Sequence, residues 1–251
     1  MDGLPRGRAL TQVNPYQRVS PNRQMAPKNV YGMPPSCPED YDPLHLSGVR
    51  ERWDQKAERW DRDVADEHFH LNEDHAFGRF LEAADAVVAR RAEFCRSQLL
   101  VDLGCGTGLV LAHFLDRFAR GLGIDISPQM LALAESRQLP RTEFLVGNGF
   151  ELDGHVPAAG AVLSRGILLS HYGPRWAPLL LEQVRPVLCP GGFTVLDFLN
   201  AAARHDYASN PANKSYYSAE QVASLAGQAG FARATVLGEP ERRVLLLLAE
   251  C

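Results

Sequence analysis

The spacing of apolar residues divides the chain near residue 97. From Ser47, apolar side chains recur every three or four positions between charged ones, a period that predicts amphipathic helices. The first expected helix has its apolar face at Val49, Trp53, Ala57, Trp60 and Val64. The second should begin after a cap at 72–74, and its apolar face contains Phe77, Phe80, Leu81, Ala84 and Val88.

After Ser97, short apolar runs alternate with helical stretches. The runs predict strands at 99–103, 121–126, 142–146, 161–164 and 193–198. Helices are expected after Gly108, from Ser127-Pro128 onward and over 176–188. Strands that alternate with helices indicate a parallel sheet. A last helix over 218–229, ended by Gly230, precedes runs at 234–237 and 244–249, which are close enough to pair as an antiparallel hairpin.

Residues 1–45 have a different composition. Eight of the 17 prolines fall here, among Gln, Asn, Arg and Ser, so this stretch cannot build a core. We expect a flexible, proline-rich leader. The alternative is an arm that folds over a bound substrate, suggested by Tyr16, Tyr31, Met33 and Tyr41.

Charge disfavours a nucleic-acid substrate, and length excludes a membrane-spanning segment. The 251 residues include 26 basic and 30 acidic ones, a net charge of -4, which gives no overall attraction to nucleic acid or anionic lipid. The longest apolar run, 244–249, is far short of the roughly 20 residues that cross a bilayer. The N-terminus lacks the apolar core of a secretory signal, and the five cysteines show no disulfide or zinc spacing. We therefore expect a cytoplasmic protein with reduced thiols.

Three glycines follow the first predicted strand directly. Gly104, Gly106 and Gly108 allow a sharp turn and a close approach of the backbone to a ligand. Their spacing differs from the G-x-G-x-x-G of dinucleotide-binding proteins, which disfavours a nicotinamide dehydrogenase. Asp125 closes the second strand, where a carboxylate can accept hydrogen bonds from both hydroxyls of a ribose. The pattern predicts adenosine binding; the alternative is a tight turn that serves only helix packing.

Five motifs taken together resemble the class I S-adenosylmethionine-dependent methyltransferases, in the order and spacing of that family: 101–108 (VDLGCGTG), 121–131 (GLGIDISPQML), 143–152 (EFLVGNGFEL), 164–173 (SRGILLSHYG) and 188–198 (LCPGGFTVLDF). The resemblance covers residue 76 to residue 251. It implies a Rossmann-like α/β fold with a seven-stranded, mostly parallel sheet, an antiparallel last strand and helices on both faces. It also implies S-adenosyl-L-methionine as cofactor. The corresponding division is a leader at 1–45, an N-terminal helical cover at 46–96 and the cofactor-binding domain at 97–251.

The resemblance assigns cofactor-binding positions. It places the glycine loop at the methionine part of the cofactor and Asp125 at its ribose. Ile126 and Met130 are placed against the adenine. The full cofactor set is Asp102, Gly104, Cys105, Gly106, Gly108, Asp125, Ile126, Met130, Asn148, Gly149, Phe150, Ser164 and Arg165. Asn148 departs from the family, which usually has an acidic residue there. Its side-chain carbonyl can still accept a hydrogen bond from the adenine amino group, without charge assistance.

Candidate bases lie at the ends of the fourth and fifth strands. By family analogy, residues 164–166 face the transferable methyl group. His171 and Tyr172, on an expected loop, offer a group that titrates near neutrality and a hydroxyl, and Asp197 is a second candidate base. The alternatives are that His171 and Tyr172 face solvent or pack, and that Asp197 only caps a loop.

No metal site is expected. The densest group of potential ligands is formed by Glu67, His68, His70, Glu73, Asp74 and His75. His68 and His70 would diverge on a helix, and the acidic pair fits helix capping equally well. Some of these histidines could belong to a lid over the substrate, and a solvated connection is the remaining alternative.

The sequence therefore predicts methyl transfer from S-adenosylmethionine to oxygen or nitrogen of a small metabolite. The compact domain with a helical cover resembles the metabolite-modifying branch of the family, including natural-product enzymes. An RNA- or protein-modifying enzyme and a catalytically silent cofactor-binding module remain alternatives. We expect residues up to about Asp74 to form the acceptor side of the site; Trp53 and Trp60 could equally pack against the back of the core. The acceptor and the oligomeric state are left open.

Overall fold

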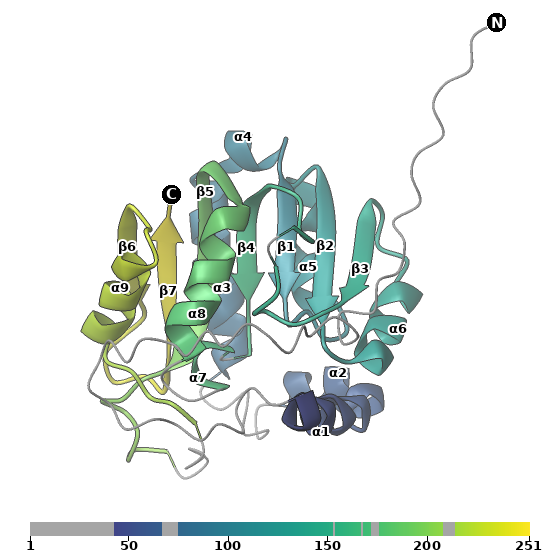
Figure 1. Ribbon diagram of the computed structural model, residues 1–251, viewed down its shortest axis with the longest axis horizontal. Coiled ribbons are helices and arrows are strands. Elements are labelled where there is room, and N and C mark those ends of the chain that lie inside the picture. Colours follow the sequence, from purple (N-terminus) through teal and green to yellow (C-terminus); the bar gives the residue numbers. More distant parts are fainter. Residues whose placement is uncertain (1–42, 67–74, 153, 167, 172–175, 208–213) are drawn as a thin grey trace, which may run out of the picture.

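A mixed β-sheet forms the centre of the protein. The computed structural model describes residues 43–66, 75–152, 154–166, 168–171, 176–207 and 214–251. Within these ranges, seven strands pair in the order β3-β2-β1-β4-β5-β7-β6 (Figure 1). The strands are β1 (Leu99–Leu103), β2 (Arg120–Asp125), β3 (Thr142–Val146), β4 (Ala159–Ser164), β5 (Leu188–Leu199), β6 (Arg233–Leu237) and β7 (Val244–Glu250).

Strand direction matches the expectation. The pairs β1–β2, β1–β4, β2–β3 and β4–β5 are parallel, and β7 runs antiparallel to both β5 and β6. The two-stranded hairpin predicted at 234–249 is therefore confirmed, and its second strand also enters the sheet beside β5. Because parallel strands end at the same edge, the carboxyl ends of β1 to β4 meet at one edge.

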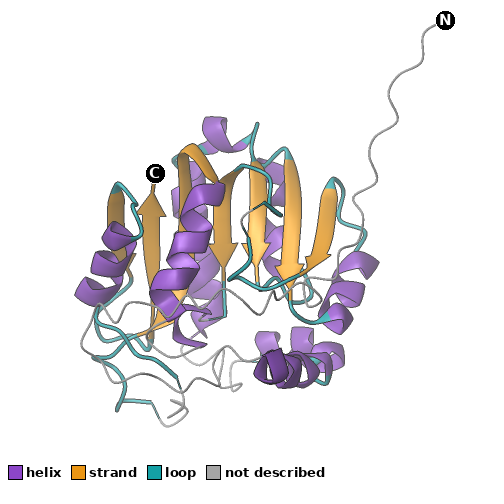
Figure 2. Cartoon of the chain, viewed as in Figure 1, coloured by secondary structure: helices purple, strands orange, loops and turns teal. Residues whose placement is uncertain are grey.

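Helices cover both faces of the sheet (Figure 2). α8 (Trp176–Val187) and α9 (Ala219–Gln228) lie on the face turned to the viewer, and α3 (Ala76–Ala89) and α5 (Leu109–Phe114) lie behind. The remaining α-helices are α1 (Pro43–Asp54), α2 (Trp60–Ala65), α4 (Ala92–Cys95), α6 (Pro128–Ser136) and α7 (Leu168–His171). Two 3-10 turns, Ala57–Arg59 and Leu115–Arg117, complete the described elements. α1 and α2 lie beneath the edge at which β1 to β3 end.

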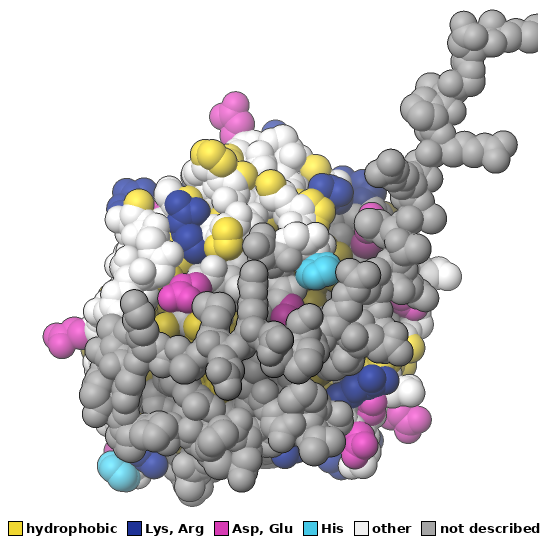
Figure 3. All heavy atoms as spheres, viewed as in Figure 1, with side chains coloured by type: hydrophobic (Ala, Val, Ile, Leu, Met, Phe, Trp, Pro, Cys, Tyr) yellow, Lys and Arg dark blue, Asp and Glu magenta, His cyan; other side chains and the backbone are white. Residues whose placement is uncertain are grey.

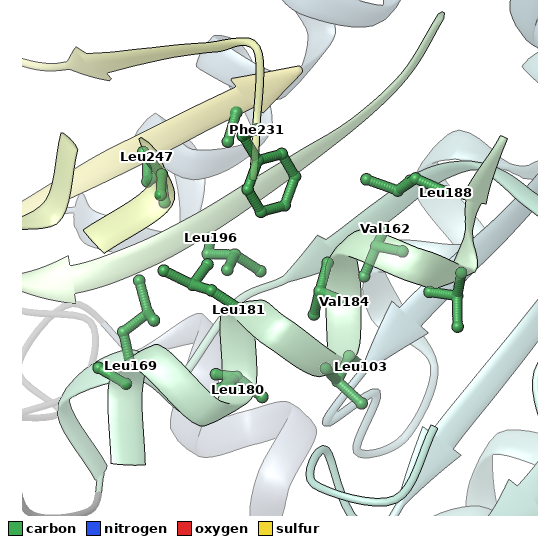
Figure 4. Packing of buried hydrophobic residues seen from close by; sticks show 14 of the residues in the cluster. Leu103, Val162, Leu169, Leu180, Leu181, Val184, Leu188, Leu196, Phe231 and Leu247 are labelled. Atoms are coloured by element: carbon green, nitrogen blue, oxygen red, sulfur yellow. The ribbon is translucent and has the colours of Figure 1, made fainter. Parts of the chain in front are cut away.

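The core has two layers, one on each face of the sheet. Leu180, Leu181 and Val184 of α8 pack on Val162 and Leu196 of the sheet (Figure 4). The opposite layer is formed mainly by side chains of α3, α5 and the strands: Phe80, Ala84, Val87, Val110, Phe114, Leu100 and Val195. All five residues of β1 are buried because both its faces are covered, which explains why its sequence is an apolar run rather than an alternation.

Helix starts follow the capping signals in the sequence. The Ser127 hydroxyl accepts a hydrogen bond from the Met130 amide at 3.1 Å, and Pro128 occupies the first turn of α6. Ser218 and Gln221 form a reciprocal capping box at the start of α9. The cap expected at 72–74 lies outside the described residues; α3 begins at Ala76, after His75 in a left-handed conformation with φ 53°.

Two expectations were wrong in detail. The continuous helix expected over 47–64 is broken: α1 ends at Asp54, a 3-10 turn follows, and α2 starts at Trp60. β5 begins at Leu188 rather than at Phe193 and passes through 190–192, whose Pro-Gly-Gly sequence is typical of a turn. The strand accommodates that turn by a shift in its register with β4, aided by Gly191 at φ 78°. Among the described helices, none is long and apolar enough to cross a membrane.

Candidate active site

A cavity opens between the carboxyl edge of the sheet and α1 and α2. It holds about 840 Å³ of empty space, counting its open side. Its walls come from the ends of β1, β2, β3 and β4, from α7, and from the N-terminal helices. Its lining residues include Val49, Trp53, Trp60, Gly104, Gly106, Asp125, Ile126, Met130, Asn148, Gly149, Phe150, Ser164, Arg165, Gly166, Leu168 and His171.

The three glycines after β1 have different surroundings. All three have positive φ, at 74°, 52° and 80° for Gly104, Gly106 and Gly108. Gly104 and Gly106 line the cavity, and a Cβ on Gly104 would meet no atom within 4 Å. A Cβ on Gly108 would lie 3.3 Å from the Ala134 side chain, so this glycine allows α6 to pack closely. Two of the glycines thus leave room for a ligand, and the third serves packing.

Asp125 lies at the end of β2 and lines the cavity. Its carboxylate accepts hydrogen bonds from the Gly106 amide at 2.8 Å and from the Ser127 amide at 2.9 Å. Burial raises the pKa of Asp125 to about 6, against the effect of these hydrogen bonds. A carboxylate has about four acceptor positions, so two bonds to the backbone leave capacity for ligand hydroxyls.

Asp102 and Cys105, both expected at the cofactor, do not line the cavity. Asp102 belongs to β1 and is 1% exposed. Burial, and secondly the charge of Asp125, raise the pKa of Asp102 to about 8. Cys105 is buried as well, and burial raises the pKa of its thiol. Neither side chain is placed to touch a ligand in the cavity.

The residues after β3 form the wall opposite the glycine loop. Asn148, Gly149 and Phe150 line the cavity together with Ile126 and Met130 of the β2–α6 segment. The Asn148 Oδ1 accepts a hydrogen bond from the Phe150 amide at 2.8 Å, and its Nδ2 donates to Glu151 at 3.0 Å. One lone pair of the amide oxygen is therefore used by the backbone turn, and a second remains for a ligand. Glu151, which holds the amide group, was missed by the sequence analysis.

The end of β4 turns along the cavity at Ser164, Arg165 and Gly166. The Ser164 hydroxyl donates to the carbonyl of Leu103 at 2.6 Å and so ties β4 to β1. Arg165 lines the cavity, its Nε is buried, and its guanidinium lies over the Phe77 ring at 5.0 Å. Burial lowers the pKa of Arg165, while the charge of Asp197 raises it.

His171 occupies a helix, α7, and not the expected loop. Its ring lines the cavity and lies 5.9 Å from the Trp53 ring, centre to centre. Burial, and next the charge of Lys214, lower the pKa of His171 to about 3, although a hydrogen bond with the backbone of Gly166 raises it. The imidazole is therefore neutral at physiological pH and weakly basic.

Asp197 lies at the end of β5, is 3% exposed and does not line the cavity. Its carboxylate accepts the Gly166 amide at 3.0 and 3.2 Å. This carboxylate holds the backbone turn behind the cavity wall, which is a positioning role. The alternative role as a loop cap fits this geometry.

The N-terminal helices form a roof over the glycine loop. Trp53 and Trp60 line the cavity and meet edge to face at 5.3 Å, so they do not pack against the back of the core. The carboxylate of Asp54 accepts the Ser127 hydroxyl at 2.5 Å, at the start of α6. Asp61 contacts both the Thr107 hydroxyl in the glycine loop and the guanidinium of Arg137.

Asp54 and Asp61 were missed by the sequence analysis. They are the residues directly after Trp53 and Trp60, at the same spacing of seven, so a signal was present. Read as an amphipathic helix, both acids fell on its polar face. The 3-10 turn at 57–59 instead lets an aromatic and an acidic residue of each segment reach the same edge of the sheet.

Tyr172 and Glu67, His68, His70, Glu73 and Asp74 lie outside the described residues. His75 is described and exposed, next to the start of α3. Over the described ranges, no three His, Cys, Asp or Glu side chains come together in a way that would hold a metal ion.

Comparison with known families agrees with this geometry. Residues 100–192 match the model of a methyltransferase domain, from β1 to the turn in β5. Over this stretch the chain is similar to methyltransferase domains. Its Rossmann-like fold with an antiparallel β7 is shared with solved methyltransferase structures.

Two curated relatives match part of this chain. Trans-aconitate 2-methyltransferase of Deinococcus radiodurans is 37% identical over 116 residues, which are 44% of this chain and 40% of the relative. The dTDP-3-amino-3,6-dideoxy-alpha-D-glucopyranose N,N-dimethyltransferase of Streptomyces fradiae is 39% identical over 56 residues, 22% of each chain. The matched stretches thus span less than half of either relative.

Solved methyltransferase structures share the fold over most of the chain. The 1,6-didemethyltoxoflavin-N1-methyltransferase of Burkholderia thailandensis, crystallised with 1,6-didemethyltoxoflavin and S-adenosylhomocysteine, superposes with a TM-score of 0.60. It is 20% identical, and the superposition covers 88% of this chain and 92% of that one. At this identity the likeness concerns the fold.

Proposed function

We propose that this protein transfers the methyl group of S-adenosylmethionine to a small-molecule acceptor. The observation that carries the proposal is the cavity itself. It combines two glycines at positive φ, a buried carboxylate at the end of β2 and an aromatic roof, at the one edge of the sheet where the parallel strands β1 to β4 end.

The residues present fit the cofactor. The space above Gly104 and Gly106 is a cradle that Cβ atoms would enter, since the Cβ of a residue at 106 would lie 3.1 Å from the Trp60 Nε1. We assign Asp125 to the ribose hydroxyls, Ile126 and Met130 to the adenine, and Asn148 to its amino group; all four residues line the cavity. When bound, the cofactor supplies a methyl group on a reactive sulfonium. The task of the chain is to hold the acceptor in line with that methyl group and to exclude water.

Several observations support a small acceptor. The cavity lies between the carboxyl edge of the sheet and α1 and α2, with Trp53 and Trp60 in its wall, so the helices cover the site. On the described part of the face in Figure 3, basic and acidic side chains are interspersed, which gives no phosphate-binding stripe there. The names of the relatives refer to trans-aconitate, an amino sugar nucleotide and 1,6-didemethyltoxoflavin, which also favours a metabolite as acceptor.

We also propose a cytoplasmic site of action, because the four described cysteines are all free thiols.

We extend the proposal to the organisation of the chain, with a helical cover at 46–96 and a cofactor-binding domain at 97–251. Support comes from the contacts of α1 and α2, which reach the domain through Asp54 and Asp61 at the cavity rim.

Calorimetry with S-adenosylhomocysteine tests the proposal. We expect a micromolar Kd, and a 10- to 100-fold weaker one in Asp125→Ala, because hydrogen bonds to a charged group contribute about 1.5–3 kcal/mol. Asp116→Ala, at a side chain that is 80% exposed on another surface, is the matched control. Equal affinities in Asp125→Ala and wild type would sink the assignment. Binding without methyl transfer to any component of a metabolite extract would instead favour a silent cofactor-binding module.

A further inference from the structure

Asp54 is the last residue of α1, and its side chain reaches the start of α6. The Oδ1 atom accepts the Ser127 hydroxyl at 2.5 Å and the Gln129 amide at 3.3 Å. The Oδ2 atom lies 3.8 Å from the Nε of Arg50, one turn earlier in α1. Asp54 and Ser127 are 73 positions apart in the chain, so their contact forms only when α1 is seated on the domain.

The first turn of α6 is capped in part by Asp54. Amides in the first turn of a helix have no partner within the helix. The Met130 amide donates to the Ser127 hydroxyl at 3.1 Å, which is a cap within the same segment. The Gln129 amide donates instead to Asp54, so a side chain of the helical cover completes the cap. A carboxylate at this place is also stabilised by the helix dipole.

The same serine holds Asp125, the carboxylate that we assign to the ribose. The Ser127 amide donates to Asp125 Oδ1 at 2.9 Å, while the Ser127 hydroxyl donates to Asp54. Ser127 is fully buried, and any shift of this residue displaces both hydrogen bonds together. The segment 125–127 therefore carries the ribose carboxylate at one end and the anchor of the helical cover at the other.

Charge also links Asp54 to Asp125. Burial is the main reason why the pKa of Asp125 is raised to about 6, and the charge of Asp54 raises it further. The charge of Asp125 acts in turn on Asp102 of β1 and on Cys105 of the glycine loop, and the raised pKa of each keeps it largely protonated at pH 7 and below. Arg50 pairs with Asp54 from the solvent side. Between pH 5 and pH 7, Asp54 is therefore a charged neighbour of Asp125 that a single substitution can remove.

We propose that Asp54 is a positioning residue of the cofactor site, which holds the start of α6 and, through Ser127, the carboxylate of Asp125. This inference rests on the proposed binding of S-adenosylmethionine. Trp53, directly before Asp54, lines the cavity and lies beside His171. Seating of α1 through Asp54 thus places Trp53 in the cavity wall and secures the ribose carboxylate at the same time. Cofactor affinity and the seating of the helical cover are linked, and each favours the other.

The pH dependence of cofactor binding tests the action of Asp54 on Asp125. Calorimetry with S-adenosylhomocysteine at pH 5 and pH 7 compares the full wild-type chain with Asp54→Asn, which keeps an acceptor oxygen and removes the charge. The wild-type Kd should be about tenfold higher at pH 5, because protonation of Asp125 removes acceptor capacity. At pH 7 the variant should bind about threefold more weakly, since neutral hydrogen bonds hold α6 less firmly. At pH 5 the two proteins should bind about equally, because Asp125 in the variant stays ionised to lower pH.

The alternatives give different results. An anchor that does not act on Asp125 would weaken binding by the same factor at both pH values, which overturns the proposal. Equal affinities at pH 7 overturn it as well. Glu51→Gln is the matched control, because it removes one negative charge from an exposed side chain of the same helix, and its Kd should follow that of wild type. A wild-type protein that does not bind at all contradicts the proposed function and this inference with it, whereas the other results concern Asp54 alone.

A double-mutant cycle tests the route through Ser127. Asp54→Ala and Ser127→Ala should each weaken S-adenosylhomocysteine binding about tenfold at pH 7, because each removes a hydrogen bond to a charged group. The double variant should bind about as weakly as Ser127→Ala alone, since both substitutions break the same contact. Effects that multiply would show that Asp54 acts independently of Ser127 and contradict the proposal. Native circular dichroism in all three variants excludes unfolding as the cause.

Hydrogen exchange measures the link between the two events. Saturation with S-adenosylhomocysteine should slow amide exchange over 49–54 in wild type, because the bound state favours the seated cover. The slowing should be several-fold smaller in Asp54→Ala, measured at a ligand concentration that also saturates the variant. Exchange over 49–54 that does not respond to the ligand in wild type, or responds equally in both proteins, overturns the proposed link.

Discussion

Asp102 shows how one buried carboxyl can matter for stability without touching a ligand. Its side chain lies on the face of β1 opposite to Leu103, and burial, followed by the charge of Asp125, raises its pKa to about 8. A carboxyl whose pKa is higher in the folded state than in the unfolded one binds more protons when folded. The resulting stabilisation is complete below pH 4 and is lost as the pH rises towards 8.

We therefore predict that Asp102→Asn flattens the pH dependence of stability. In wild type this carboxyl should lower the free energy of unfolding between pH 5 and pH 8 by a few kcal/mol, at about 1.4 kcal/mol per pKa unit. Urea denaturation at both pH values measures the difference between the two proteins. The Kd of S-adenosylhomocysteine at pH 7 should stay the same in the variant. Parallel stability curves would contradict the prediction.

Gly104 and Gly106 permit a matched pair of substitutions. Both have positive φ, so alanine strains the backbone at either position. Only at 106 does the added Cβ also approach the roof, 3.1 Å from the Trp60 Nε1. Gly106→Ala should thus weaken S-adenosylhomocysteine binding more than Gly104→Ala does, by about tenfold, with native circular dichroism in both. Trp60→Ala in the Gly106→Ala background should reduce the difference, and an unchanged difference would show that the roof contact is irrelevant.

At the scale of elements, the carboxylate of Asp61 joins α2 to the glycine loop and to the end of α6. Asp61 contacts Thr107 and Arg137, and Arg137 also donates to the Thr107 carbonyl at 2.6 Å. Asp61, Thr107 and Arg137 thus connect the N-terminal helices to the glycine loop. Opening of the roof must break the contacts of Asp61.

Asp61→Asn should make the roof open more often, because an amide forms a weaker contact with the guanidinium of Arg137. We expect faster hydrogen exchange over 49–65 and a several-fold higher dissociation rate of S-adenosylhomocysteine. Asp63→Asn is the control on the same helix, since Asp63 pairs with Arg59 and Arg62 within the cover. Exchange in 49–65 that is the same in both variants would refute a latch at Asp61.

Elements were predictable from the sequence where a buried apolar run is bounded by a glycine or a turn. β1 and β3 have the predicted bounds, because each apolar run is closed by a glycine or a turn. The break between α1 and α2 was not predictable, since a 3-10 turn over three residues keeps the apolar positions on one face. α7 is only four residues long, too short to show a helical period, so His171 was expected on a loop.

The candidate site was predictable where glycines and strand ends define it. Gly104, Gly106 and Asp125 meet in one cavity because the carboxyl ends of parallel strands do. The direction of a polar side chain inside a fully buried strand has no such signal. The alternation of apolar and polar residues is lost when both faces of a strand are covered. For this reason Asp102 was expected at the cofactor and Asp197 at the acceptor.

At the scale of the whole molecule, we expect the leader and the helical cover to contribute unequally to the cavity. Among the described residues, Val49 is the first along the chain to line the cavity. We expect removal of 1–42 to leave the Kd of S-adenosylhomocysteine within threefold. Removal of 1–66 also takes away Trp53 and Trp60, which should abolish turnover and spare much of the cofactor affinity. Calorimetry and the labelled-methyl assay on both truncated proteins measure this. Loss of cofactor binding on removal of 1–42 alone would mean that the leader contributes to the cofactor site.

The place of β7 in the sheet has a consequence for synthesis on the ribosome. β7 follows every other strand in the chain, yet it lies between β5 and β6. Until Val244–Glu250 has left the exit tunnel, β5 has an open edge and β6 has no partner. The nascent chain therefore exposes two unpaired edges that invite pairing with other chains. Chaperones that shield strand edges should matter most in that interval, and a stop codon before residue 244 should yield an aggregating product rather than a smaller enzyme.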